Sequence, residues 1–255
     1  MRTLAAVLLL TLPVAAVASD VAWVQMPAGS FRSALKYEDV PITQVAAFEL
    51  QKRPVSNGDF LAFVRADPQW QRDKVASVFA ESRYLSHWPG PNTLGTQALP
   101  EQPVTQVSWF AASAYCDAQD ARLPTWSEWE YAAAADETQF DARANPAWRE
   151  RILGWYSRPS NSALPRVGLQ AANVYGVQDL HGLVWEWAAD YSSLLIASDN
   201  RNQGDADRLK FCGAGALSMN DRENYAVLMR VAMLSSLNGK DTTTNLGFRC
   251  ARSVE

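Results

Sequence analysis

Three cysteines and two histidines are the residues whose side chains could carry nucleophilic, redox or soft-metal chemistry in this chain. Cys116, Cys212 and Cys250 lie far apart in the sequence, as do His87 and His181. In an oxidising compartment, three cysteines indicate one disulfide and one leftover thiol, and spacing alone does not say which two pair. A single thiol without assured partners is more typical of a small buried side chain than of a ligand, with a metal or redox role as the alternative.

The better-known catalytic motifs are missing from the sequence. It shows no Gly-rich phosphate loop, no Ser/His/Asp triad signature and no His-x-x-x-His pair, which disfavours NTPase, hydrolase and zinc-protease functions. A site of two histidines and one carboxylate would need both histidines at once, and neither belongs to a motif that suggests it.

The first 18 residues have the pattern of a secretory signal peptide. Arg2 is followed by an apolar run over 4–17 and by the small residues Ala16-Val17-Ala18, so we expect cleavage after Ala18. Later in the chain no segment approaches the roughly 20 consecutive apolar residues of a membrane helix. We therefore expect a periplasmic or otherwise exported protein without a membrane span.

Composition indicates one domain over 19–255 and argues against nucleic acid as a partner. Without Arg2 the chain has 22 Lys and Arg residues against 27 Asp and Glu residues, a net charge of about −5, and it has no long basic run that could neutralise phosphates. The 10 Trp, 9 Phe and 8 Tyr residues are spread evenly, which indicates one sizeable core.

Periodicity predicts short elements joined by irregular segments. Alternation over 21–31 predicts a strand that leads into a hairpin, and 45–50 is a second strand candidate. Ser56 is the expected N-cap of a helix over 57–65. Four prolines and two glycines over 88–103 predict an irregular crossing.

The second half of the chain is expected to combine two helices with long loops. A helical pattern covers 109–119, and Thr125 with Glu128 forms the capping box of the next helix. Residues 145–184 are rich in Asn, Ser, Pro, Gly and aromatic residues with weak periodicity, which predicts long ordered loops of the kind that often carry function.

Four segments, in this order, resemble the sulfatase-modifying-factor family, which contains the formylglycine-generating enzymes. They are 103–109 (PVTQVSW) with 114–116 (AYC), 121–125 (ARLPT) with 128–133 (EWEYAA), 173–176 (NVYG) with 179–187 (DLHGLVWEW), and 245–250 (NLGFRC). A weaker match at 53–57 (RPVSN) extends the likeness over nearly the whole mature chain. The resemblance implies a compact, loop-rich α+β domain akin to C-type lectins.

The resemblance also implies a calcium site. Asp179, Gly182, Val184 and Glu186 match the positions that supply two side-chain carboxylates and two main-chain carbonyls in the family. Such hard oxygen donors suit Ca²⁺, and the alternative is a solvated Asp with a Glu paired to an arginine. Leu183 replaces the usual Asn between the ligands.

By the same resemblance, Cys116 pairs with Cys250 and Cys212 is left as the free thiol. His181 is expected to pack beside the calcium loop.

The copper-binding cysteine pair of the formylglycine-generating enzymes has no counterpart here. Aligned on Ser218 and Arg230, the two positions fall at Asp221 and Ala226. Because Cu(I) prefers thiolate or thioether ligands, copper is not expected. Asp221 and its neighbours are either a solvated charged turn or the polar floor of an inherited groove, and the candidate groove residues are Ser218, Asp221, Arg222, Tyr225 and Arg230.

Two hypotheses of function follow from the resemblance. The first is an accessory or partner-binding module that recognises an extended polypeptide or a periplasmic protein, similar to the accessory proteins associated with copper nitrite reductase. The second is an exported oxidative tailoring enzyme that acts on a peptide-like substrate with another metal or cofactor, like the cysteine-lacking pyoverdine-tailoring relatives. Enzyme activity is left open, apart from the copper-dependent oxidase reaction.

Overall fold

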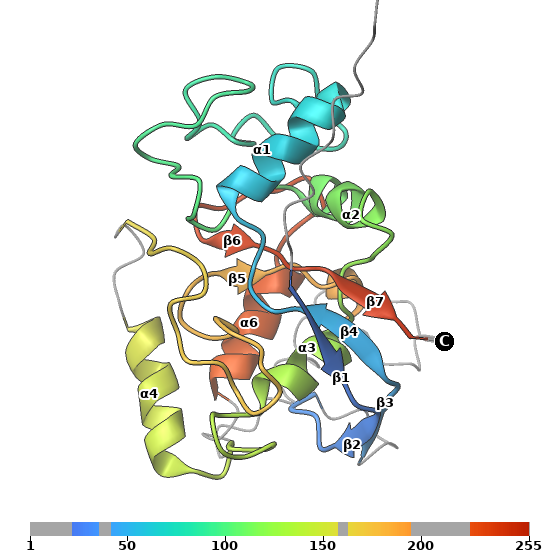
Figure 1. The fold of residues 1–255 in the computed structure, drawn as a ribbon, viewed down its shortest axis with the longest axis vertical. Helices are drawn as coiled ribbons and strands as arrows, with labels where there is room; N and C mark the ends of the chain where they lie inside the picture. Colours follow the sequence, from blue (N-terminus) through green and yellow to red (C-terminus); the bar gives the residue numbers. More distant parts are fainter. Residues whose placement is uncertain (1–21, 36–41, 158–162, 195–224, 255) are drawn as a thin grey trace, which may run out of the picture.

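The computed structural model describes residues 22–35, 42–157, 163–194 and 225–254. Over these residues the chain forms short helices and strands joined by long irregular segments (Figure 1). The helices are α1 (Asn57–Ala66), α2 (Trp109–Asp117), α3 (Trp126–Ala133), α4 (Pro146–Tyr156) and α6 (Tyr225–Ser235), with the 3₁₀ turns η1 (Pro68–Trp70) and η2 (Tyr191–Ser193). None of the helices within these ranges has the length and apolar character needed to cross a membrane.

The described strands form three small sheets. The strands are β1 (Trp23–Met26), β2 (Gly29–Phe31), β3 (Thr43–Val45), β4 (Phe48–Gln51), β5 (Trp185–Glu186), β6 (Leu246–Gly247) and β7 (Ala251–Ser253). An antiparallel sheet has the order β1-β4-β7, so both ends of the described chain share it, while β2 pairs with β3 and β5 pairs in parallel with β6. The predicted strand over 21–31 is thus divided at Pro27 into β1 and β2, and its hairpin partner is divided into β3 and β4.

Both predicted N-caps are confirmed. The Ser56 hydroxyl accepts a hydrogen bond from the Asp59 main-chain N–H, and the Asp59 carboxylate accepts one from the Ser56 N–H. Thr125 and Glu128 make the same reciprocal pair at the start of α3. Each box satisfies two of the amides that a helix start leaves without partners.

The expectation of loops throughout 145–184 is wrong for its first part, because α4 forms there. Asn145 caps the helix by accepting from the Ala147 N–H, and Pro146 occupies its first turn, where a missing N–H has no cost. Figure 1 shows α4 beside the loops that follow it, and α6 packs against both α4 and η2.

The expected disulfide is present. Cys116 of α2 and Cys250, which lies directly before β7, are joined across 134 positions of sequence, and both are fully buried. The bond ties a central helix to the sheet that holds both ends of the described chain.

Candidate functional site

The structure describes only part of the predicted groove. Ser218, Asp221, Arg222 and the expected free thiol Cys212 lie outside the described residues. Tyr225 begins α6, and Arg230 lies about 1.4 turns further along the same helix.

Arg230 is an internal cation of the fold. Its side chain is 1 % exposed, and its guanidinium carbon lies 3.8 Å from the ring centroid of Trp129 and 5.3 Å from that of Trp185. Nη2 donates to the carbonyls of Leu180 and Val184 at 3.3 Å each. Burial lowers the pKa of Arg230. The side chain therefore fastens α6 to the loop over 179–186.

The backbone of this loop is fixed at both of its left-handed residues. Asp179 has φ of +60° and Gly182 has φ of +82°. A Cβ atom on Gly182 would collide with the indole of Trp155, so glycine is required there for its conformation and for space. The Asp179 carboxylate accepts from the main-chain N–H groups of Gly168 and Gln170, and burial raises its pKa.

Glu186 lies at the end of the loop and is bound by two side chains. Arg249 donates from Nε and Nη2 to the two carboxylate oxygens, 2.8 Å in both cases, and the Trp129 indole N–H donates to Oε2 at 2.9 Å. Both charged side chains are fully buried. Trp129 thus contacts Glu186 through its N–H and Arg230 through its ring face, so its indole holds both side chains in place.

His181 is packed among aromatic rings, as expected from the sequence. The rings of Trp129, Trp148 and Trp155 lie 5.7, 5.5 and 6.3 Å from it, centroid to centroid. Its Nε2 lies 2.8 Å from the Ala133 carbonyl, which assigns the proton to Nε2. Burial lowers the pKa of His181 to about 3, so the imidazole is neutral near pH 7.

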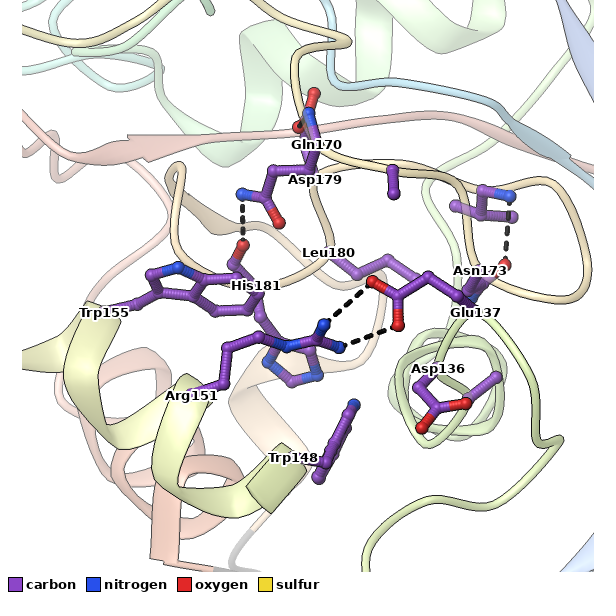
Figure 2. A pocket seen from close by; sticks show the side chains of 13 residues that line it. Asp136, Glu137, Trp148, Arg151, Trp155, Gln170, Asn173, Asp179, Leu180 and His181 are labelled. Atoms are coloured by element: carbon purple, nitrogen blue, oxygen red, sulfur yellow. Dashed lines mark hydrogen bonds and ion pairs between the residues drawn. The ribbon is translucent and has the colours of Figure 1, made fainter. Parts of the chain in front are cut away.

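A small cavity of about 40 Å³ lies beside this loop (Figure 2). Asp179 and His181 line it from the loop, and Trp148, Arg151 and Trp155 line it from α4. Arg151 makes a bidentate ion pair with Glu137 at 2.9 and 3.0 Å, drawn as dashed lines in Figure 2. This volume holds one or a few water molecules, far below the several hundred Å³ of a typical ligand pocket.

The oxygen donors suggested for calcium fit a hard cation in their chemical type. A carboxylate oxygen can accept two hydrogen bonds, so each Asp179 oxygen and Oε1 of Glu186 retain acceptor capacity in the contacts above. Glu186 is already paired with Arg249, and the Val184 carbonyl already accepts a hydrogen bond from Arg230. Both contacts put a positive charge beside an oxygen atom suggested as a calcium ligand. No group of three or more His, Cys, Asp or Glu side chains within the described ranges is arranged to hold a metal. Calcium accordingly stays a prediction.

Sequence reasoning found the loop but not the helix beside it. Trp148, Arg151 and Trp155 come from α4, which was expected to be a loop. The Asn145-Pro146 pair was the available signal, because Asn at the N-cap with Pro at the next position is a typical helix start.

The fold and the loop define a sulfatase-modifying-factor-like protein. The model of the sulfatase-modifying factor enzyme 1-like domain matches residues 12–254, and the chain belongs to this family. The chain is 30 % identical over 189 residues to a formylglycine-generating enzyme of Streptomyces coelicolor, a match that covers 67 % of this chain and 59 % of that protein.

Other relatives differ in their named activity. A mouse protein named inactive C-alpha-formylglycine-generating enzyme 2 is 27 % identical over 286 residues, covering 93 % of this chain and 87 % of its own. The solved structure of PvdO from Pseudomonas aeruginosa matches with a TM-score of 0.50 and 18 % identity, over 91 % of this chain and 94 % of that one. That likeness supports the loop-rich α+β fold.

Proposed function

We propose that this protein is an exported, formylglycine-generating-enzyme-like module that binds a polypeptide partner and does not carry out the copper-dependent reaction. The observation that carries the proposal is the state of the loop over 179–186. Each of its ionisable side chains is bound to main chain or to an opposite charge: Asp179 to two amides, His181 to a carbonyl and Glu186 to Arg249. These groups hold the loop in place, as a binding scaffold requires.

The two histidines give acid–base chemistry little support. Burial lowers the pKa of both His87 and His181, whereas an efficient general base has a pKa near the working pH. At the two positions expected for the copper cysteines, the sequence has Asp221 and Ala226, and neither side chain offers the soft sulfur that Cu(I) prefers.

The finer form of the proposal concerns the partner. The resemblance to accessory proteins of copper nitrite reductase favours a periplasmic enzyme as the partner. The protein would bind this enzyme, or an extended segment of it, while the enzyme matures. The mouse relative is named as an inactive formylglycine-generating enzyme. A non-catalytic role for this protein agrees with that name. We propose calcium as a structural ion of Asp179, Gly182, Val184 and Glu186.

The oxidative tailoring alternative rests on the cluster of Ser218, Asp221, Arg222, Tyr225 and Arg230. Arg230 is 1 % exposed and packs on two tryptophan rings. This position favours a structural role for Arg230 over contact with a substrate, so we favour the binding module.

The test compares the protein with an active relative. The mature chain and the Streptomyces coelicolor enzyme are loaded with Cu(I) and incubated with the same cysteine-containing peptide, and the aldehyde product is measured by mass spectrometry. We expect product from the relative alone. An Asp221→Cys/Ala226→Cys variant is the matched control, and we expect it to gain Cu(I) affinity. Turnover by the unmodified chain would overturn the proposal.

Binding is tested separately with photocrosslinking in the exporting cell. A photoreactive residue is placed at exposed Leu169, and a second at exposed Val78 as the control. We expect one defined crosslinked protein from position 169, and the same purified protein should bind in vitro without being chemically changed. Identical crosslinks from both positions would contradict a specific partner near this loop.

A further inference from the structure

A second cavity lies beside β2 and α3, apart from the loop over 179–186. Its volume is about 320 Å³, which lies at the lower end of the range of small-molecule sites. Phe31, Tyr131, Phe140 and Tyr175 line it, together with Asp141. No residue of the loop over 179–186 lines this cavity.

The four aromatic side chains form a continuous row. Neighbouring ring centroids are 5.7 Å apart for Phe31 and Tyr131, 5.5 Å for Tyr131 and Tyr175, and 5.1 Å for Tyr175 and Phe140. All three pairs are tilted, with angles of 44–51° between the ring planes. Distances and tilts of this kind are typical of aromatic pairs that stabilise one another.

The row is built into the fold but remains accessible at one end. Tyr131 is supplied by α3, and a Cβ atom at Gly29 of β2 would collide with the Tyr131 hydroxyl, so the absence of a side chain at Gly29 makes room for this ring. Phe140 is 62 % exposed at the other end of the row. An aromatic side chain held at this exposure next to a cavity is available to a ligand.

A carboxylate lies at the edge of the cavity. Asp141 lines it and its side chain is 51 % exposed, while its ion partner Arg143 also lies 3.6 Å from the buried Glu130. One guanidinium is thus shared by two carboxylates, and burial raises the pKa of the Glu130 carboxyl. The Arg143 guanidinium carbon already lies 5.7 Å from the Phe31 ring centroid, a cation–π distance.

From these observations we propose that the cavity lined by Phe31, Tyr131, Phe140 and Tyr175 binds an alkylammonium group, with Asp141 at its edge. Aromatic rings attract such a cation through their quadrupole and tolerate its methyl or methylene groups. A carboxylate at the edge repels anions and adds attraction for the cation. This proposal is independent of the proposed function, since it rests on different residues.

The test compares two probes of nearly the same shape by calorimetric titration of the mature protein. Choline carries the charge, and 3,3-dimethylbutan-1-ol is its uncharged counterpart. We expect choline to bind about two- to fivefold more tightly, which is the factor expected from one exposed cation–π contact. Equal affinities for the two probes, or binding of neither, would overturn the proposal.

Variants locate the binding. Phe140→Ala removes an exposed ring, and we expect it to weaken choline binding about two- to fivefold. Phe79→Ala is the matched control, because Phe79 is 43 % exposed and its ring contacts Trp70 and Phe110 away from this cavity. Asp141→Asn should weaken choline binding without changing the affinity for the uncharged probe. Unchanged choline affinity in Phe140→Ala would overturn the assignment even if the Asp141 variant failed to fold.

A third probe distinguishes the source of the ammonium group. Nα-acetyl-lysine methylamide represents a lysine of a polypeptide, and choline represents a free quaternary amine. Tighter binding of the lysine derivative assigns the site to a polypeptide ligand, and tighter binding of choline assigns it to a small molecule. Either result supports the alkylammonium site if Phe140→Ala weakens that binding.

Discussion

Arg249 and Glu186 form an ion pair in which neither side chain has exposed surface. The same guanidinium donates to the main-chain carbonyls of Gln51, at the end of β4, and Gln178, directly before the loop. One side chain near the end of the chain therefore joins the main sheet, the start of the loop and the strand β5 that ends it. Such a group stabilises the fold only while its charge is balanced.

Glu186→Gln is expected to lower the free energy of unfolding by about 3–5 kcal/mol, because it leaves Arg249 buried without its counter-charge. Urea unfolding followed by tryptophan fluorescence measures the change. The measurement is made in a chelator, so that any loss of a bound metal is not counted.

Glu137→Gln is the matched control for this substitution. Its partner Arg151 is 43 % exposed and Glu137 is 39 % exposed, and an exposed pair contributes about 0–1 kcal/mol. A Glu186 variant that lost no more stability than the Glu137 variant would refute the structural role of the buried pair.

The sequence predicted best the elements that depend on contacts between residues close together in the chain. The capping boxes at Ser56 and Thr125 each involve residues three positions apart, so the signal and the contact are both local. In α4 the cap was also local, but the apolar and charged residues that follow have weak periodicity. Only two of its residues, Trp148 and Ile152, are buried, which explains the weak pattern.

The sequence predicted the loop over 179–186 but not the side chains that pack against it. Residues 179–186 were found because an ordered set of motifs marks them. The stacking of Arg230 on Trp129, which lies 101 positions earlier in the sequence, depends on how α6 packs on α3 and the loop. No spacing rule relates two such residues, so Arg230 was assigned to a groove rather than to the interior.

Loss of the Cys116–Cys250 disulfide is expected to destabilise the protein by about 5 kcal/mol, because the bond closes a loop of 134 positions and the entropy gained by the unfolded chain grows with loop length. A Cys116→Ser/Cys250→Ser variant tests this in urea.

The same pairing predicts a thiol count. Alkylation of the unfolded, unreduced protein should label only Cys212, and reduction should expose all three cysteines. A Cys212→Ser variant is the control and should take up no label before reduction. Labelling of Cys116 or Cys250 in the unreduced protein would show that the disulfide does not form in the purified protein.

Calcium at Asp179 predicts that a chelator lowers the melting temperature of the wild-type protein. At a free calcium concentration 100-fold above the dissociation constant, the ion contributes about 2.7 kcal/mol. Elemental analysis of the protein purified without chelator should find stoichiometric calcium, and Asp179→Asn should abolish both the metal and the chelator effect.

Asp136→Asn is the matched control for calcium. Asp136 is 7 % exposed against 3 % for Asp179, and its carboxylate also accepts main-chain hydrogen bonds. The control variant should lose some stability but keep the full chelator effect. If the wild-type protein contains no calcium and chelation leaves its melting temperature unchanged, the predicted calcium site is wrong.

The burial of a neutral His181 side chain predicts that the protein loses stability as the pH falls. Burial lowers the pKa of His181 in the folded protein from the usual 6.5 to about 3, so between these values the unfolded chain binds a proton that the folded protein does not. Its contribution is complete above pH 6.5 and is lost as the pH falls toward 3, at up to about 1.4 kcal/mol per pH unit. A His181→Phe variant lacks this dependence. The difference between the slopes of the two proteins isolates the contribution of His181 from that of the carboxylates common to both.

Nitrogen NMR should show His181 neutral at pH 5 with its proton on Nε2, because Nε2 faces the Ala133 carbonyl. Equal slopes in the two proteins, or a charged imidazole at pH 5, would mean that the ring is open to water and that the three tryptophans do not seal it.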